Sequence, residues 1–432
     1  MSKLNPKHAK PQAGTRIAVV TMGVKLGDEQ RGYTRFRKIA EMLADAGFSV
    51  DLYTSSFQHW EKAQRDTERA CYQGLPYNIA FIEEPGYERN LDLQRIRSHH
   101  VAARNLQTLF DDAFKENPQA YSLIYSEIPP NDVARVCAET AQKHGIPYVA
   151  DINDLWPEAM RMVVDVPVLS DLAFHPFERD ARVVYQTLTA AVGTSDEYAT
   201  RPGKDRTKPY THLTVYVGND LKVFDAGVAA HAAEIEKPEG EVWVTYAGTL
   251  GASYDLATLV HASTLLDQKL EAEGQAQRQR IGAIRVKILG DGPDRQKLEE
   301  LAAQLDAPVD FLGYTPYDKM AAYLSKSDIT VNSLVKSAAQ SIVTKIGDYL
   351  AAGIPLINTG SSIEFRHKVD NDGFGENVRA EDPDALAATI AYLATHPGVR
   401  KIMGAKARAI AESQFDQDKS YLAIVGLIRN LT

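Results

Sequence analysis

Cysteine is scarce in this sequence: only Cys71 and Cys137 occur in 432 residues. Two cysteines are too few for a disulfide framework or a cysteine zinc site, and their scarcity fits a reducing compartment. Long apolar runs are lacking too, since none approaches the roughly 18 residues of a membrane-spanning helix. The start, MSKLNPKHAKPQAGT, is polar and basic and lacks the apolar core of a signal peptide. We therefore expect a soluble cytoplasmic protein that could still sit on a membrane surface.

An excess of positive charge is also lacking. The chain has 48 Lys and Arg against 57 Asp and Glu, a net charge of −9. A generally acidic protein is a poor nucleic-acid binder unless one face is basic, so we expect no nucleic-acid partner. The 44% of hydrophobic and 24% of charged residues are ordinary for a globular protein. At about 150 residues per domain, the length predicts two or three domains.

Apolar, β-branched strands alternate with helical spacing along both halves of the chain. The first half begins with strand 16–22, helix 33–46 and strand 48–54, and the second half restarts with a strand at 243–248. This alternation predicts right-handed βαβ units and parallel sheets. We expect an α/β protein with two doubly wound, Rossmann-like domains facing across a cleft, in which ligands bind at the carboxyl ends of the strands.

A polar segment at 221–241 separates the two halves and sets the expected domain bounds. Residues 1–15 are predicted to be a flexible basic tail. Residues 16–225 would form the N-terminal domain and residues 226–414 the C-terminal domain. Residues 415–432 would form a C-terminal helix that could cross back to the N-terminal domain.

The segment QSIVTKIGDYLAAGIPLIN, residues 340–358, carries the strongest local signal. A polar loop leads into a helix expected to begin near Thr344, and such a helix start attracts phosphate. The backbone N–H groups expected to face out of it belong to Ser341, Ile342, Val343 and Thr344. Lys345 adds a full positive charge, and Asp348 lies on the same face one turn later. These groups suit a nucleotide sugar, although a capped surface helix with a Lys–Asp pair has the same spacing.

Two segments of the first half offer further candidate residues. In the loop GVKLGDEQRGYTRFR, Gly32 opens a helix and permits close approach of a phosphate, with Arg31, Arg35 and Arg37 nearby, although such a loop can also be a simple turn. In DINDLWPE, the carboxylates Asp151, Asp154 and Glu158 surround Trp156, whose ring could cover a sugar. The alternative there is a buried Trp with a helix-capping Asp.

A third group of residues could line an acceptor channel, with exposed helix positions as the alternative. The group consists of Tyr87, Asn90, Arg95, His99 and His100. Three D-x-D triplets, starting at Asp370, Asp382 and Asp416, are about what chance gives in a chain this rich in Asp, so we expect no metal site.

Segments of the second half, taken together, resemble one family. They are YAGTLGASYDLATLVHA, ILGDGPDRQKLEELAAQL, FLGYTPYDKMAAYLSKSDITVNS and QSIVTKIGDYLAAGIPLIN. The last is similar to the "E, seven residues, E, then A-x-x-G-x-P" signature of the retaining group 1 glycosyltransferases, which have the GT-B fold. The resemblance covers most of residues 240–415.

The first half resembles one branch of the same family. IPYVADINDLWPEAM is similar to the "giPyv-x-D-x-R-D-L-W-P-E" segment of O-antigen and capsule transferases, in particular the N-acetyl-fucosaminyltransferase-like branch. EEPGYERNLDLQRIRSHH resembles a "P-x-Y-x-x-N…R-I" stretch of that branch. TAAVGTSDEYA and VYVGNDLKVF resemble other usual segments of the family.

The resemblance implies a retaining hexosyl- or N-acetylhexosaminyl-type glycosyltransferase of bacterial surface polysaccharide biosynthesis. The donor would be a nucleotide-diphosphate sugar, with UDP as the expected nucleotide, held by the C-terminal domain. The acceptor would be a glycan or an undecaprenyl-diphosphate-linked sugar, reached by peripheral contact with the inner face of the cell membrane. Neither a metal nor a cofactor is implied.

The resemblance also assigns roles to residues. Lys345 would stabilise the leaving diphosphate, and Asp154 is the fallback base, because the leaving phosphate itself is often proposed to deprotonate the acceptor. The donor site would include Gly32, Thr249, Gly251, Gln340, Ser341, Ile342, Val343, Thr344 and Asp348. The acceptor site would include Tyr87, Asn90, Arg95, Asn153 and Trp156.

The chain departs from the family pattern at several positions. Gln340 and Asp348 stand where the common signature has Glu, and Thr249 stands near where many relatives have Arg followed by Lys. Asn153 precedes Asp154 where relatives often place a His. Two alternatives follow: a sugar-nucleotide epimerase of the same fold, and a non-catalytic partner subunit that binds a nucleotide sugar.

Overall fold

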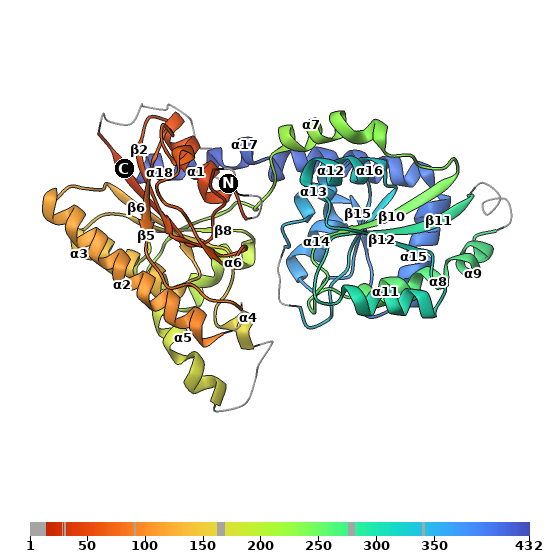
Figure 1. Cartoon of the computed structure of the whole chain (residues 1–432), viewed down its shortest axis with the longest axis horizontal. Helices are drawn as coiled ribbons and strands as arrows, with labels where there is room; N and C mark the ends of the chain where they lie inside the picture. The colour runs from red at the N-terminus through yellow and green to blue at the C-terminus, as the bar shows by residue number, and fades with distance from the viewer. Residues whose placement is uncertain are drawn as a thin grey trace. The chain divides into compact units, whose positions relative to one another are not determined.

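The computed structural model describes residues 14–27, 29, 32–89, 92–161, 169–274, 281–338 and 342–432. The chain divides into two compact units (Figure 1). Unit 1 is Met1–Val215 with Tyr421–Thr432, and unit 2 is Tyr216–Ser420. The division falls before the polar segment that was expected to separate the halves, because helix α7 (Leu221–His231) packs within unit 2 against α12 (Tyr317–Lys326).

Unit 1 is built on a parallel seven-stranded sheet with the order β5-β2-β1-β6-β7-β8-β9. The strands are β1 (Arg16–Thr21), β2 (Ser49–Ser55), β5 (Asn78–Ile82), β6 (Leu123–Ile128), β7 (Tyr148–Ile152), β8 (Ala190–Gly193) and β9 (Thr211–Thr214). The central strands are apolar along nearly their whole length because helices bury both faces of the sheet.

The helices of unit 1 form two layers (Figure 1). One face is covered by α2 (Leu93–Glu116), α3 (Asn131–His144), α5 (Leu169–Thr187) and α6 (Asp196–Thr200). The other face is covered by α1 (Arg35–Asp45) and the last helix, α18 (Leu422–Leu431), whose Ile424 and Ile428 are fully buried. Shorter elements are the hairpin β3 (Phe57–Gln58) and β4 (Ala63–Gln64), the turns Ala70–Tyr72 and Arg201–Lys204, and α4 (Glu158–Arg161).

Unit 2 repeats this arrangement with a parallel six-stranded sheet of order β12-β11-β10-β13-β14-β15. The strands are β10 (Glu241–Ala247), β11 (Ala283–Leu289), β12 (Val309–Gly313), β13 (Ile329–Asn332), β14 (Leu356–Asn358) and β15 (Gly375–Asn377). In β10 every residue after Glu241 is buried, as its run EVWVTYA predicts.

Helices also cover both faces of the second sheet. One face packs against α8 (Leu256–Thr264), α9 (Leu266–Ala272), α11 (Arg295–Gln304) and α15 (Pro383–Thr395). The other packs against α7, α12, α13 (Ile346–Ala351), α14 (Ile363–Asp372) and α16 (Pro397–Ile410). The remaining elements are the turn Ala232–Glu234, the π-helical segment Ala411–Phe415 and α17 (Gln417–Ser420). The expected α/β architecture of two doubly wound domains is confirmed.

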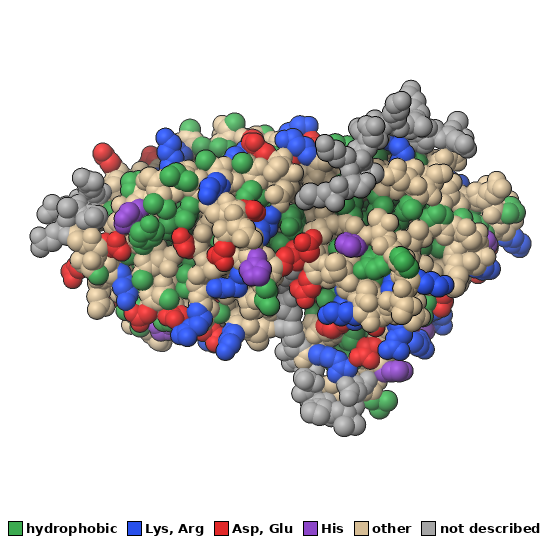
Figure 2. Space-filling model, turned by 180° about the vertical axis from the view of Figure 1, so that it is seen from behind, with side chains coloured by type: hydrophobic (Ala, Val, Ile, Leu, Met, Phe, Trp, Pro, Cys, Tyr) green, Lys and Arg blue, Asp and Glu red, His purple; other side chains and the backbone are tan. Residues whose placement is uncertain are grey.

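The described surface mixes charges of both signs. Figure 2 shows Lys and Arg side chains interspersed with Asp and Glu side chains over the face that it presents. Among the described residues, none of the helices combines the length and the apolar character that crossing a membrane would require.

Candidate functional site

Lys345 is the central residue of the candidate site in unit 2. It lies at the start of α13, and only 9% of it is exposed. Its Nζ donates a hydrogen bond of 2.7 Å to Tyr246 Oη at the end of β10. The same nitrogen lies 4.0 Å from the ring centre of Tyr246 and 3.7 Å from that of Tyr254. The Lys345 ammonium therefore sits between two aromatic faces at the carboxyl end of a central strand.

Gly248 makes room for this ammonium group. Its φ is +153°, and a Cβ atom at this position would lie 2.6 Å from Lys345 Nζ. A side chain at residue 248 would therefore displace the lysine, and glycine meets the backbone requirement at the same time. The loop after β10 and the start of α13 thus approach each other closely only because residue 248 is glycine.

The electrostatic environment of Lys345 is unusual for a cation. Burial lowers its pKa well below the usual value of 10.5. Among the described residues, no Asp or Glu forms an ion pair with it, and its stabilisation comes from a hydroxyl and two aromatic faces. Buried charges in proteins are normally paired. An anionic ligand would supply the missing partner.

Asp348 lies one turn further along α13 and contacts other elements. Its Oδ1 accepts hydrogen bonds from Tyr317 Oη, at 2.7 Å, and from Asn219 Nδ2, at 3.0 Å. Burial raises the pKa of its carboxyl to about 6. Lys345 and Asp348 were expected on one helix face. Within the described residues, however, Lys345 contacts Tyr246 and Tyr254, whereas Asp348 bonds Tyr317 and Asn219, so the two side chains have different partners.

Two further candidates for the donor site, Thr249 and Gly251, lie in the loop after β10. Thr249 is exposed, and its carbonyl accepts a hydrogen bond from Tyr246 Oη at 2.7 Å. The carbonyl of Gly251 accepts from the N–H of Tyr254 at 2.8 Å. Both therefore belong to the loop that holds the aromatic partners of Lys345.

The helix start itself differs from the expectation. The helix begins at Ile346 rather than near Thr344, because the N–H of Ile346 bonds to the carbonyl of Val343 in a preceding turn. Val343 is buried, Ile342 is half-buried and Thr344 is exposed. Gln340 and Ser341 lie outside the described residues.

In unit 1, three of the predicted acceptor residues come together. The Arg95 guanidinium carbon lies 4.8 Å from the ring centre of Trp156 and 5.4 Å from that of Tyr87. His99 stacks on Trp156 at 6.2 Å and meets the edge of Tyr87 at 5.7 Å. Tyr87, Arg95, His99 and Trp156 are called the aromatic cluster below. Asn90 lies outside the described residues, and His100 is exposed on α2.

Two residues of the β3–β4 hairpin extend the aromatic cluster and were not predicted from the sequence. His59 Nδ1 lies 2.6 Å from Tyr87 Oη, and Lys62 Nζ lies 4.7 Å from the Tyr87 ring centre. Burial, with the charges of Arg95 and Lys62, lowers the pKa of His59 to about 3. Burial and Arg95 lower the pKa of Lys62 to about 8. At neutral pH the hairpin thus adds a neutral imidazole and a cation to the aromatic cluster.

Asp154 and Asn153 are both engaged within the chain. Asp154 accepts hydrogen bonds from the Leu155 N–H at 2.9 Å and from Trp156 Nε1 at 3.1 Å, and burial raises its pKa. Asn153 donates through Nδ2 to the carbonyl oxygen of Asp151 at 3.0 Å. Asp154 therefore holds the indole of Trp156, which is itself buried.

The loop after β1 differs from its predicted role in two respects. Helix α1 begins at Arg35 rather than at Gly32, and the φ of Gly32 is +130°. A Cβ at Gly32 would lie 2.9 Å from the Trp60 ring and 3.0 Å from Lys25 Cβ, so glycine is needed there for packing. Arg35, offered as a phosphate-binding cation, is instead buried against Asp151, with Nε 2.9 Å from Oδ2.

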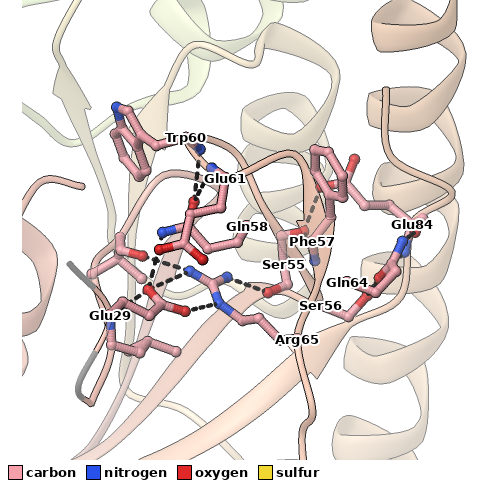
Figure 3. Close-up of polar contacts among 12 residues, drawn as sticks. Glu29, Ser55, Ser56, Phe57, Gln58, Trp60, Glu61, Gln64, Arg65 and Glu84 are labelled. Carbon is pink, nitrogen blue, oxygen red and sulfur yellow. Dashed lines mark hydrogen bonds and ion pairs between the residues drawn. The ribbon is translucent and has the colours of Figure 1, made fainter. Parts of the chain in front are cut away.

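A second buried pair fixes the same loop to the hairpin (Figure 3). Arg65 binds Glu29 through Nε, at 2.6 Å, and Nη2, at 3.1 Å, and also donates to the carbonyls of Ser55 and Val24. Glu29 in turn accepts from the N–H of Leu26 at 2.9 Å. These bonds join the loop after β1 to the segment after β2. Both of these segments lie at the carboxyl ends of the strands, where Trp60 packs against Gly23 and Gly32.

No metal centre is apparent in the part of the chain that the structure describes. Within those ranges, no three or more His, Cys, Asp or Glu side chains gather so that they could hold a metal ion. The D-x-D triplet starting at Asp382 supplies a helix cap, because Asp382 accepts from the N–H of Ala385 at the start of α15.

Comparison with known proteins identifies the second unit. Residues 244–396 match the family model described as "Glycosyl transferases group 1". The matched stretch lies within unit 2 and is similar to a group 1 glycosyltransferase domain. It contains Lys345, Asp348 and the Thr249–Gly251 loop, so the described donor candidates of unit 2 lie within the matched residues. Comparison with curated proteins finds no match for this sequence.

Solved structures extend the likeness over both units. Sucrose-phosphate synthase from Thermosynechococcus elongatus aligns with a TM-score of 0.68 at 18% identity, over 96% of this chain and 99% of that chain. HepE from Anabaena in complex with UDP aligns with a TM-score of 0.66 at 14% identity, over 96% and 100%. WaaG, a glycosyltransferase involved in lipopolysaccharide biosynthesis, aligns with a TM-score of 0.60 at 14% identity, over 95% and 99%. These likenesses show that the chain has the GT-B fold.

Proposed function

We propose that the chain transfers a sugar from a nucleotide-diphosphate sugar to a hydroxyl group of a glycan or lipid-linked acceptor. The observation that carries this proposal is the buried Lys345 ammonium, which has two aromatic faces and a hydroxyl around it and no acidic partner among the described residues. A diphosphate is the counter-ion that such a site requires. Its charge grows as the sugar departs, so a cation held in place lowers the energy of the transition state.

The surroundings of Lys345 support a diphosphate as the ligand. Gly248 and Gly251 lie in the loop between Tyr246 and Tyr254, and their lack of a side chain allows phosphate oxygens to approach the backbone closely. In this proposal Asp348 accepts hydrogen bonds from ribose hydroxyls, a role that its carboxyl already plays toward Tyr317 and Asn219. UDP is the nucleotide we favour, since HepE, with the same fold, was solved in complex with UDP and with UDP-glucose.

The aromatic cluster of unit 1 supports a sugar-bearing acceptor. The faces of Trp156 and Tyr87 suit the apolar side of a sugar ring, and Arg95 and Lys62 would attract a phosphate or another acidic group on it. We propose retention of the anomeric configuration and a role in O-antigen or capsule synthesis at the inner face of the membrane. These proposals rest on the sequence resemblance, and WaaG offers a fold-level parallel.

Binding of UDP to the full-length protein tests the donor site. We expect UDP to raise the Tm of the wild type, since a ligand that binds only the native state stabilises it by mass action. Lys345→Ala should abolish this shift, while Lys297→Ala, which removes an exposed lysine of α11, should keep it. Equal UDP affinity in the wild type and in Lys345→Ala would contradict the proposal.

The reaction is then separated from its two alternatives with UDP-glucose and UDP-N-acetylglucosamine. Release of UDP together with a glycosylated acceptor supports a transferase. Formation of the epimeric sugar nucleotide without release of UDP would identify an epimerase. Tight donor binding without turnover on any lipid-linked acceptor would favour a non-catalytic partner subunit.

A further inference from the structure

Glu127 lies at the point where the strand order of the first sheet reverses. Strands β2 and β5 extend from one side of β1, whereas β6 and the later strands extend from the other side. Parallel α/β sheets bind ligands outside the carboxyl ends of the strands at such a switch point. Glu127 is the last but one residue of β6, and Thr21 is the last residue of the adjacent β1. The carboxyl group of Glu127 therefore stands where a ligand of unit 1 is expected.

The Glu127 carboxylate is held in place by the end of β1. Its Oε2 accepts a hydrogen bond of 2.6 Å from Thr21 Oγ1 and one of 3.1 Å from the N–H of Met22. A Cβ at Gly23 would lie 3.9 Å from Oε1 and 3.4 Å from the Trp60 ring. Among the described residues, no Lys, Arg or His forms an ion pair with Glu127, so hydrogen-bond donors and not a cation position it.

The neighbours of Glu127 connect it with the predicted acceptor residues. Burial, then the charges of Glu127 and Asp154, raise the pKa of Tyr33. Burial is the main cause that raises the pKa of Tyr87 to about 12, and Glu127 contributes. Tyr33 also meets Trp60 edge to face at 5.1 Å. Aromatic rings and carboxyl groups thus converge at the carboxyl ends of β1, β6 and β7, the combination that binds the faces and hydroxyls of sugars.

We propose that Glu127 is the acceptor-binding carboxylate of this protein, which accepts a hydrogen bond from a hydroxyl group of a sugar acceptor and orients it. The proposal rests on the proposed transferase function and names the part of the acceptor that Glu127 contacts as a hydroxyl-bearing sugar ring. Trp60 and Tyr33 supply faces for this ring, and Oε2 keeps its two bonds to Thr21 and Met22 while the carboxylate binds.

Burial also gives the ionised form of Glu127 a limited pH range. It raises the pKa of this carboxyl to about 7, with Asp151 contributing and with the bonds from Thr21 and Met22 opposing the rise. The ionised carboxylate that accepts a hydroxyl proton is therefore lost as the pH falls through 7. The titratable groups that interact with it electrostatically are Tyr33, Tyr87 and Asp151.

The variant Glu127→Gln distinguishes a role of Glu127 in ligand binding from a purely structural role. The amide oxygen of the new side chain can keep both bonds from Thr21 and Met22, whereas its NH₂ group replaces the second acceptor oxygen by a donor. A merely structural role of Glu127 would thus be retained in this variant. Glu116→Gln, at an exposed position at the end of α2, is the matched control for the loss of one negative charge.

The experiment measures binding of octyl glycosides of glucose, galactose, N-acetylglucosamine and fucose to the full-length protein in the presence of saturating UDP. We expect at least one glycoside to bind the wild type, and Glu127→Gln to weaken it about tenfold, the loss of one hydrogen bond to a charged group. The affinity of the wild type should fall from pH 8.5 to pH 6, and that of Glu127→Gln should not. UDP affinity and Tm should match those of Glu116→Gln.

Each contrary outcome has one meaning. Equal glycoside affinity in the wild type and in Glu127→Gln would overturn the assignment of Glu127. Absence of binding of all four glycosides to the wild type would overturn it as well. Failure of UDP to bind the wild type would instead overturn the proposed function, and the two failures are therefore distinguishable.

Discussion

Lys345 Nζ donates a hydrogen bond of 2.7 Å to Tyr246 Oη, and the same hydroxyl donates to the carbonyl of Thr249 at 2.7 Å. This relay joins the start of α13 to the loop after β10, two segments separated by about a hundred residues of sequence. A lysine held in this way has lost its side-chain freedom before any ligand arrives. The ordering cost that a flexible surface lysine would pay on binding a diphosphate is therefore already met by the fold.

Replacement of Lys345 by methionine should separate stability from activity. Without its ligand, the protein bears the cost of a buried amine that has no acidic partner in the described residues. We expect Lys345→Met to have an equal or higher free energy of unfolding in urea and a rate of sugar transfer lower by about two orders of magnitude or more. A normal transfer rate in this variant would refute the diphosphate assignment.

Binding of UDP should be accompanied by uptake of protons at Lys345. Burial lowers the pKa of Lys345 in the free protein, and a diphosphate beside it raises this pKa again, so the protonated fraction of Lys345 increases on binding. Calorimetric titrations in buffers with different ionisation enthalpies measure this uptake. Asp348→Asn serves as the control for the second titrating carboxyl, and an enthalpy independent of the buffer would contradict the prediction.

The buried pair Arg35–Asp151 should be essential for the stability of unit 1. Both side chains are almost fully buried, at 2% and 0% exposure, and they form two hydrogen bonds of 2.9 and 3.1 Å. Removal of one partner leaves an uncompensated charge, so Asp151→Asn or Arg35→Met should lower the free energy of unfolding by about 3–5 kcal/mol. Urea titration monitors this change.

The exposed pair Arg37–Glu41 provides the comparison for this loss. Both residues lie on α1, as Arg35 does. Arg37 Nε is 3.5 Å from Glu41 Oε1, and both side chains are about one-third exposed. Arg37→Ala should change the free energy of unfolding by less than about 1 kcal/mol. Similar losses in the Arg35 and Arg37 variants would show that burial of Arg35 does not matter.

Two glycine substitutions should have opposite effects. Gly32 has a φ of +130°, and a Cβ there would clash with Trp60 at 2.9 Å, so Gly32→Ala should destabilise unit 1 by roughly 1–3 kcal/mol. Gly426 lies within α18, and a Cβ there would meet nothing within 4 Å. Gly426→Ala should therefore raise the stability by about 0.5–1 kcal/mol. Thermal unfolding of both variants checks these signs.

Chelation should leave sugar transfer largely intact. In the proposed mechanism Lys345 and backbone amides provide the positive charge at the leaving diphosphate, so no divalent ion is required. Transfer rates measured with EDTA and with added Mg²⁺ should agree within about twofold. A strict dependence on Mg²⁺ would contradict the assignment of this role to Lys345.

Local sequence patterns predicted much of the fold. The strand expected at 16–22 is β1, which ends at Thr21, and the strand expected at 48–54 is β2, which spans Ser49–Ser55. Such elements follow from short-range features: buried strands are continuous apolar runs, and α3 ends at Gly145, whose φ of 67° suits a left-handed helix cap. The β3–β4 hairpin was not predicted, because its strands have two residues each and leave no periodic pattern.

Candidate site residues were predicted less evenly. Tyr87, Arg95 and Trp156 do come together, since Arg95 lies in the first turn of α2 and Tyr87 and Trp156 lie in the loops after β5 and β7. Lys62 and His59 were missed because they lie in the short hairpin, and Glu127 was missed because a single Glu at the end of an apolar strand has no motif. The place of these three residues in a site depends on which strands become neighbours in the folded sheet.

The sequence by itself determined the alternation of strands and helices, the two parallel sheets and the residues that a diphosphate would need. Only the tertiary structure decided which charges are available to a ligand. Arg35 was one of several plausible phosphate-binding cations in the sequence, but the fold brings Asp151 to it across 116 residues and uses its charge internally. Lys345 is left among tyrosines instead. The reason is physical: the desolvation of a charge and its compensation depend on neighbours in space, which the order of residues along a chain does not specify.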